Sequence, residues 1–374
     1  MSNDSFRSLL STFEAATGSQ PTSAKLSKVN GENNPEKPLI ELTTQLFNYS
    51  QIRQSASSKL SARSSRNINQ VSDPVHVAVC LCIVDTLPHA RVWEYWCDHG
   101  NARISAQLYL HAKHPGEIRS QFARSKLLQI SHNPNWNDVR VVHAMISLME
   151  EALKNPKVTH IIFGTESCLP ICPLNEVELK HNRSYIQYYG KDNFNRFDER
   201  EVWDVVKQFV PSQAIHKALP GWCCLCRSHA QTILNLPQDY LEGQQLYTAF
   251  TDCWAPEEAF FPTALALLGL LDETENKALT FAEWNDRARD HQDRAHPRVW
   301  DALFDADLVQ TLRHVHGCII LRKVTREVSL EAWLEAVEKT VVVEARSGTK
   351  RPVQGNDHLQ PQSKALKAAP KTKG

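Results

Sequence analysis

The stretch VHVAVCLCIV at residues 75–84 is the apolar, β-rich run from which the fold can be predicted. It ends at Asp85 and leads into HARVWEYWCDHG at residues 89–100, a helix-like segment. The alternation continues with AQLYLHA at 106–112, the amphipathic DVRVVHAMISLMEEALKN at 138–155, and VTHIIFG at 158–164. Apolar strands that alternate with helices favour parallel pairing and right-handed crossovers, so the sequence predicts an α/β sheet.

Further short strand candidates follow along the chain, separated by helical stretches such as APEEAFFPTALALLGLL at residues 255–271. They are SYIQYYG at 184–190, GWCCLCR at 221–227, LTFAEW at 279–284, GCIILRKV at 317–324 and TVVVEA at 340–345. A single α/β domain over residues 75–345 accounts for all of them.

The two ends of the chain differ in composition from this domain. Residues 1–74 are rich in Ser, Asn, Thr and Gln, a composition that buries too little apolar surface to offset the entropy of ordering, and we expect a disordered arm. Residues 346–374 carry seven Lys or Arg against one Asp, and we expect a solvated basic tail.

Composition excludes some classes of function. The 374-residue chain balances 42 basic against 42 acidic residues, which argues against a nucleic-acid-binding protein. No run approaches the ~20 apolar residues that a membrane helix needs, and residues 1–20 lack a signal-peptide pattern. The ten cysteines form no pair of CxxC motifs, so a structural zinc site is not indicated; those in strand-like runs, such as Cys80 and Cys82, are expected to be buried apolar side chains.

Ligands of open α/β sheets bind beyond the carboxyl ends of the strands. Asp85, the turn at 111–114 and the segment after Gly164 are therefore the expected pocket positions. The first strand is followed by no glycine-rich phosphate loop, so this inference does not separate a dehydrogenase from a kinase or a transferase.

Four segments narrow the choice between these classes of enzyme. They are TESCLP at 165–170, PEEAFFPT at 256–263, TFAEW at 280–284 followed by HP at 296–297, and ILRKV at 320–324. Each has an ordinary structural explanation: the adjacent acids of PEEAFFPT, for example, suit the first turn of any helix because of the helix dipole. Their combination and their order carry the information.

In this order the segments resemble the core-2/I-branching β-1,6-N-acetylglucosaminyltransferase family, including its plant-type members. The matching family patterns are an SESCxP-like turn after a strand, a PDE-H-x-x-P-T-like segment, a TWxxW-like segment followed by HP, and a FARKF-like strand. LYLHAK at 108–113 resembles the family's strand that ends in a histidine turn, and Trp136 matches the tryptophan that opens its next helix. The resemblance covers residues 75–325.

The resemblance implies a single GT-A-like (Rossmann-like) domain that lacks the metal-binding DxD motif and uses basic side chains in place of the cation. Positive charges placed beforehand at the diphosphate stabilise the charge that grows there as the glycosidic bond breaks. Arg298 and Lys323 are the residues that the match assigns to this task, with Arg322 as the alternative to Lys323 if the register shifts by one. Asp85 and His111 are further candidates for donor binding.

The same match assigns the general base to Glu258, since the acceptor hydroxyl needs a positioned group to take its proton. Glu257, where the family usually has Asp, is a candidate for orienting the loop and for binding the acceptor, and the roles of the two residues exchange if the helix starts elsewhere. Glu166, Ser167 and Trp284 are the other candidates for acceptor binding. Displacement without a covalent intermediate would invert the anomeric centre.

The resemblance further implies UDP-GlcNAc as donor, a glycan or glycoprotein acceptor, no metal or other cofactor, and residence in the Golgi with membrane association. At the histidine turn the animal enzymes have an HVD-like sequence where this chain has His111-Ala112-Lys113, so UDP-xylose and UDP-glucuronic acid stay open as donors. A non-catalytic nucleotide-sugar-binding or interaction protein of the same fold is the alternative function; the presence of Glu258 favours catalysis.

Overall fold

The computed structural model describes residues 74–190, 204–236, 245–284, 297–300, 306–325 and 327–338. The predicted arm lies outside these residues except for Pro74, as do the predicted tail and the strand candidate at 340–345. The boundaries predicted for the arm, the domain and the tail therefore stay predictions.

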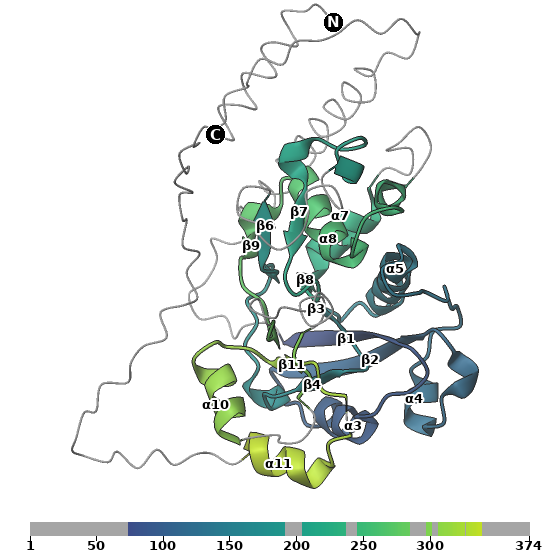
Figure 1. The fold of residues 1–374 in the computed structure, drawn as a ribbon. Coiled ribbons are helices and arrows are strands. Elements are labelled where there is room, and N and C mark those ends of the chain that lie inside the picture. The colour runs from purple at the N-terminus through teal and green to yellow at the C-terminus, as the bar shows by residue number, and fades with distance from the viewer. Residues whose placement is uncertain are drawn as a thin grey trace, which may run out of the picture.

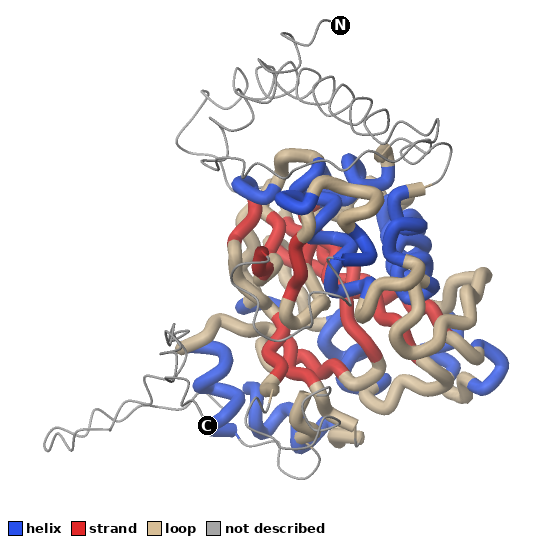
Figure 2. Tube along the Cα trace, turned by 45° about the horizontal axis from the view of Figure 1, so that its top comes forward, coloured by secondary structure: helices blue, strands red, loops and turns tan. Residues whose placement is uncertain are grey.

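The architecture is mixed α/β, as the sequence predicts. In the described part of the chain the largest sheet has six strands in the order β2-β1-β3-β8-β5-β9. These strands are β1 (Val75–Ile83), β2 (Ile104–Ala112), β3 (His160–Thr165), β5 (Ser184–Tyr185), β8 (Cys224–Cys226) and β9 (Thr274–Glu275). Figure 1 shows β1 and β2 between two groups of helices, and Figure 2 shows the strands running through the middle of the molecule.

Two smaller sheets complete the β structure of the described residues. One has three strands in the order β10-β11-β4 and the other pairs β6 with β7. Their strands are β4 (Cys168–Pro170), β6 (Tyr188–Gly190), β7 (His216–Ala218), β10 (Thr280–Ala282) and β11 (Ile320–Arg322).

Parallel pairing is confirmed where the predicted strands alternate with helices. β1 pairs in parallel with β2 on one side and with β3 on the other. The expectation of parallel pairing fails further along the sheet: β8 is antiparallel to both β3 and β5. Strand direction there depends on how the chain returns through the irregular segment before β8, which the apolar pattern of β8 does not encode.

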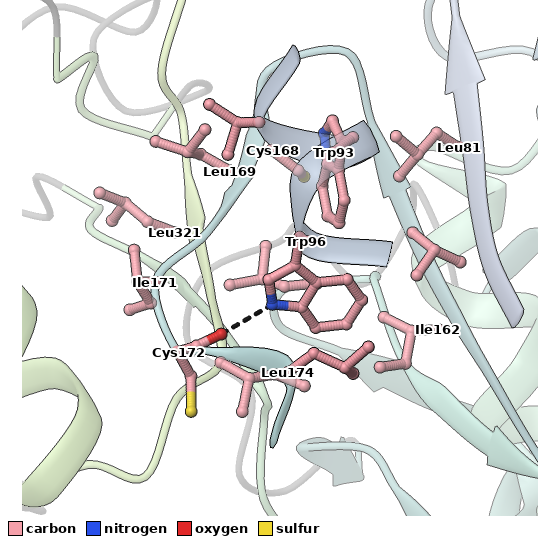
Figure 3. Close-up of a cluster of buried hydrophobic side chains, with 14 of the residues drawn as sticks. Leu81, Trp93, Trp96, Ile162, Cys168, Leu169, Ile171, Cys172, Leu174 and Leu321 are labelled. Atoms are coloured by element: carbon pink, nitrogen blue, oxygen red, sulfur yellow. Dashed lines mark hydrogen bonds between the residues drawn. The ribbon is translucent and has the colours of Figure 1, made fainter. Parts of the chain in front are cut away.

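Each face of the central sheet has its own core because successive side chains of a strand point to opposite faces. Val79 and Leu81 of β1 belong to one cluster, which includes residues of α3 (Ala90–Asp98), α10 (Ala306–His314) and α11 (Leu330–Glu338). In this cluster the indole N–H of Trp96 donates to the carbonyl of Cys172 at 2.7 Å, so its polar atom is satisfied (Figure 3).

The opposite face of the sheet is covered by other helices. Ala78 and Cys80 of β1 pack in a second cluster with residues of α5 (Arg140–Leu153), α7 (Arg227–Leu234) and α8 (Pro256–Leu267). α5 is amphipathic and buries one stripe here, as predicted from its pattern, whereas α8 is buried on nearly all sides. Burial of its first turn brings the carboxylates of Glu257 and Glu258 inside the molecule.

The cysteines act as apolar core residues. All ten lie in the described part of the chain and all are free thiols; eight are buried, and Cys82 and Cys97 are half-buried. Burial raises the pKa of the Cys97 and Cys223 thiols to about 12, so both are protonated at neutral pH. The burial expected for Cys80 is confirmed.

Candidate active site

The carboxyl ends of the three central strands meet at one edge of the sheet. Cys82 near the end of β1 pairs with His111 of β2 and with Thr165 of β3, so the three side chains lie in a row on one face. Asp85 is exposed two residues beyond β1. This is the edge at which the sequence predicts ligand binding.

The turn after β3 is held against the strand β11. The backbone N–H of Val324 donates to the carbonyl of Ser167 at 2.8 Å, and Arg322 pairs with Cys168 across the two strands. This pairing joins segments more than 150 residues apart, and it places the predicted Glu166 and Lys323 in one neighbourhood.

Glu166 faces two cations in this neighbourhood. Burial raises the pKa of the Glu166 carboxyl, while the charges of Arg322 and Lys323 oppose that rise. Burial and the adjacent Arg322 guanidinium lower the pKa of Lys323. Both basic side chains of the ILRKV segment thus lie near the TESC turn. The sequence left open whether Arg322 or Lys323 has the predicted role at the diphosphate, and neither residue is excluded by its position.

The first turn of α8 supplies the second acidic element. Ala255 precedes the helix with φ of 47°, in the left-handed region, and its N–H donates to the side-chain oxygen of Asn137. Pro256 then occupies the first helical position, where its missing N–H costs nothing. Glu257 and Glu258 follow in the first turn, where the helix dipole favours negative charge.

Glu258 forms an ion pair inside the molecule. Its Oε2 lies 3.3 Å from Nζ of Lys217 in β7, and the two side chains are 11% and 0% exposed, respectively. Thr263 of α8 holds β7 in place, since its hydroxyl accepts from the N–H of His216 and donates to the carbonyl of the same residue. Gly221 packs against Glu258 so closely that a Cβ there would lie 2.7 Å from Cγ of Glu258.

Glu257 has a different environment. Burial, and then the charge of Glu258, raise the pKa of its carboxyl to about 7, while Lys217 and Arg322 act in the opposite direction. Its buried Oε2 has no hydrogen-bond partner among the described residues. The positive charge of Arg322 acts on both Glu166 and Glu257, so the TESC turn and the start of α8 are within electrostatic reach of the same guanidinium. The Arg322 guanidinium also lies 5.2 Å from the ring centre of Trp222.

Arg298 and Trp284 lie along the adjoining backbone. Trp284 and Pro297 form a β-bridge, and the N–H of Arg298 donates to the carbonyl of Glu283 at 2.7 Å. The Arg298 side chain is 58% exposed, pairs with the Glu283 carboxylate at 3.3 Å and stacks on Trp300 at 4.2 Å. The backbone N–H of Trp300 in turn donates to the carbonyl of Lys323 at 2.8 Å, which ties this segment to the same strand end.

His111 lies behind the site rather than on its surface. It is fully buried, and its Nε2 accepts the backbone N–H of His132 at 2.9 Å. Burial, together with the nearby His132, lowers the pKa of His111 to about 4, so the ring is neutral at physiological pH. Donor contact by His111 stays a prediction; in this structure the residue supports the loop that follows β2.

The structure thus brings together Asp85, Glu166, Ser167 and Lys323 around the TESC turn and adds the start of α8 beside it. Sequence reasoning did not single out Lys217, Gly221 or Trp222. No signal in the sequence indicated Lys217, because the three-residue strand HKA that buries it is too short to be predicted. Its partner could not be read from the spacing.

Two further observations concern metals and membranes. No group of three or more His, Cys, Asp or Glu residues is arranged to hold a metal ion in the part of the chain that the structure describes. Metal independence of the reaction stays a prediction. Among the same residues, none of the helices has both the length and the apolar character needed to cross a bilayer.

Comparison with known proteins gives the same family as the motifs. Residues 78–307 match the family model described as Core-2/I-Branching enzyme. The chain is also similar to a protein named Glycosyltransferase BC10 from Oryza sativa subsp. japonica, with 21% identity over 262 residues. That match covers 61% of this chain and 63% of the relative, so the chain spans less than two thirds of the relative's length. The family match covers more than half of the chain, which therefore belongs to the core-2/I-branching enzyme family.

Proposed function

We propose that this protein is an inverting glycosyltransferase that moves a sugar from a nucleotide sugar to a hydroxyl of a glycan. The observation that carries the proposal is the buried carboxylate of Glu258 in the first turn of α8, whose neighbour Glu257 is within electrostatic reach of Arg322, the residue that precedes Lys323. A base and a cluster of cations at one sheet edge are what a displacement at a sugar phosphate requires.

The cations act on the leaving group. As the bond between the anomeric carbon and the diphosphate oxygen breaks, both bonding electrons stay on the diphosphate. Lys323, with Arg322 as its neighbour, would stabilise this charge, and the exposed Arg298 would approach from the adjoining segment. Desolvation lowers the pKa of Lys323, and a bound anion would stabilise its charged form. With cations in place the reaction would need no metal.

Glu258 acts on the acceptor. The acceptor oxygen forms the new bond to the anomeric carbon from the face opposite the diphosphate, and its proton passes to the Glu258 carboxylate. One displacement inverts the configuration, so an α-linked nucleotide sugar yields a β-glycoside. Lys217, at 3.3 Å from Oε2 of Glu258, holds the carboxylate in place. Glu166, Ser167, Trp284 and Glu257 would contact the acceptor around it.

UDP-GlcNAc is the donor that we propose, and a glycan or glycoprotein the acceptor, because the chain belongs to the core-2/I-branching family. The same membership is compatible with function in the Golgi, in association with its membrane. The rice relative is named a glycosyltransferase without a stated donor, so UDP-xylose and UDP-glucuronic acid are tested as alternative donors.

The test is ligand-induced thermal stabilisation of the full chain with UDP, UDP-GlcNAc, UDP-xylose, UDP-glucuronic acid and GDP-mannose, each with and without EDTA. A ligand that binds the native state raises the melting temperature by an amount that grows with the logarithm of the ratio of its concentration to its Kd. We expect UDP and one UDP-sugar to stabilise the protein equally with and without chelator. Stabilisation that EDTA abolishes and Mn²⁺ restores would overturn the metal-free mechanism. Absence of any response would favour a non-catalytic interaction protein of the same fold over the transferase.

A further inference from the structure

The loop at residues 130–138 is fixed to the end of β2 by several polar contacts. The Ser131 hydroxyl donates to the carbonyl of Ala112 at 2.8 Å, and the N–H of His132 donates to Nε2 of His111. Nζ of Lys113 donates to the side-chain oxygen of Asn135 at 2.7 Å. The loop therefore keeps a defined position at the edge where the candidate active site lies.

The other end of this loop is joined to the start of α8. The side-chain oxygen of Asn137 accepts the N–H of Ala255, the residue directly before the helix. Asn137 itself has φ of 59°, a left-handed conformation that asparagine tolerates better than most residues. The loop thus bridges the end of β2 and the helical turn that carries Glu257 and Glu258.

This fixed loop presents an aromatic side chain to solvent. Trp136 is 65% exposed and packs edge to face against Trp254, with ring centres 4.9 Å apart and an interplanar angle of 88°. A tryptophan this exposed, on a loop with defined contacts at both ends, gains little for the fold from its ring. The ring of Trp136 thus contacts Trp254 and is still mostly accessible to solvent.

The pair lies close to the proposed base. Trp254 precedes Glu258 by four residues, a path that spans at most ~14 Å even when fully extended. The path includes the left-handed Ala255 and the first helical turn, so it is far from extended. A chain of sugars that places one hydroxyl at Glu258 can therefore reach the indole pair with a neighbouring unit.

We propose that Trp136, supported by Trp254, is a second sugar-binding platform that holds a unit of the acceptor away from the reacting hydroxyl. The inference rests on the proposed transferase function and extends its acceptor site. The C–H face of a pyranose packs against an indole ring, while the exposed Asn133 and Asn135 border the loop with polar groups for its hydroxyls. The platform would favour acceptors of two or more units over a single sugar.

The experiment compares the wild-type chain with Trp136→Ala, Trp136→Tyr and the control Phe209→Ala, which removes another exposed aromatic ring. Binding of cello-, xylo- and β-galacto-oligosaccharides of one to six units is measured by calorimetry without donor. We expect affinity to rise with length in at least one series. Trp136→Ala should lower affinity for the longer members roughly tenfold, and the tyrosine variant and the control should retain it. Affinity for the single sugar should not change.

The outcomes separate this proposal from the transferase itself. Length-independent binding in the wild type, no binding of any series, or unchanged binding by Trp136→Ala would each overturn the platform. Stabilisation by a UDP-sugar tests the transferase alone, and Trp136→Ala should retain it. Trp136-dependent oligosaccharide binding in a chain that no nucleotide sugar stabilises would leave the platform standing and refute the transferase.

Discussion

Glu257 and Glu258 are neighbours in the chain, yet their surroundings assign them different tasks. Glu258 lies at ion-pair distance from Lys217, with 3.3 Å between Oε2 and Nζ. Glu257 is buried beside Glu258, and the pKa of its carboxyl rises to about 7. Two carboxylates whose environments differ in this way are typical of sites where one removes a proton and the other orients or donates.

The role of Glu258 is tested by Glu258→Gln, which keeps the shape of the side chain and removes its basicity. We expect turnover to fall by roughly a hundredfold or more, the usual contribution of a general base, with stabilisation by the donor unchanged. Initial rates of transfer and donor-induced melting shifts measure the two effects separately. Glu117→Gln, at an exposed position beyond β2, is the control. Near-normal turnover in Glu258→Gln would refute the assignment.

The raised pKa of Glu257 predicts a pH-dependent stability. The folded state binds this proton more tightly than the unfolded state, so the contribution is complete below about 4.5 and is lost as pH rises through about 7. Glu257→Gln carries no titrating group and should lose less stability between pH 5 and pH 8 than the wild type. Urea denaturation across this range measures the difference, and parallel curves for the two proteins would contradict the prediction.

Lys217 is tested through its partner. Lys217→Met fills a similar volume but leaves the Glu258 carboxylate buried without this cation, and we expect a loss of about 3 kcal/mol or more in unfolding free energy. The double variant with Glu258→Gln has no uncompensated carboxylate. Its loss of unfolding free energy should therefore be smaller than the sum of the losses in the two single variants. Denaturant titrations of the four proteins give the coupling. Strictly additive losses would show that the ion pair contributes nothing.

At the scale of elements, long segments with a clear period were predictable and short ones were not. β1 and α5 were predicted to within two residues because their apolar patterns are long enough to define a face. The short strands β4 and β7 were not predicted, because each is stabilised by a distant partner rather than by its own sequence. GWCCLCR is a strand only over Cys224–Cys226.

The close packing between Gly221 and α8 gives a prediction at this scale. A Cβ at residue 221 would lie 2.7 Å from Cγ of Glu258 and 3.1 Å from its Cα, so Gly221→Ala must displace the helix start or the carboxylate. We expect a loss of about 1–3 kcal/mol in stability and a larger proportional loss in transfer rate. Gly116→Ala is the matched control, since a Cβ there meets nothing within 4 Å. Equal activity of both variants would show that the contact does not position Glu258.

At the scale of the whole molecule, the site is assembled from segments that the sequence keeps far apart. Glu166, Glu258 and Lys323 come from three parts of the chain, joined by the pairing of β4 with β11 and by the packing of α8 under β7. Their grouping could be predicted only from a resemblance to a family, because local periodicity contains no information on such distances. Lys217 completes the group and was missed for this reason.

The central sheet also couples the two cores, which predicts how the molecule unfolds. Leu81 of β1 is fully buried in one cluster, and Phe163 of β3 is fully buried in the other, although both strands belong to one sheet. Leu81→Ala should cost about 2–5 kcal/mol and Phe163→Ala about 3–5 kcal/mol, since each leaves a cavity. Because both clusters share the strands of the central sheet, either substitution should shift a single unfolding transition of the described domain. Neither should unfold the cluster on one face of the sheet by itself.

Far-ultraviolet circular dichroism, tryptophan fluorescence and UDP binding, each followed through a urea titration, should therefore change at the same midpoint in any one variant. Val315→Ala, at a position that is 73% exposed, should leave the unfolding free energy within about 0.5 kcal/mol of the wild type. Two separated transitions in Phe163→Ala would mean that the α5 and α8 side unfolds independently. The base on α8 and the cations on β11 could then separate without global unfolding, and the rigid site that the proposed displacement requires would not exist.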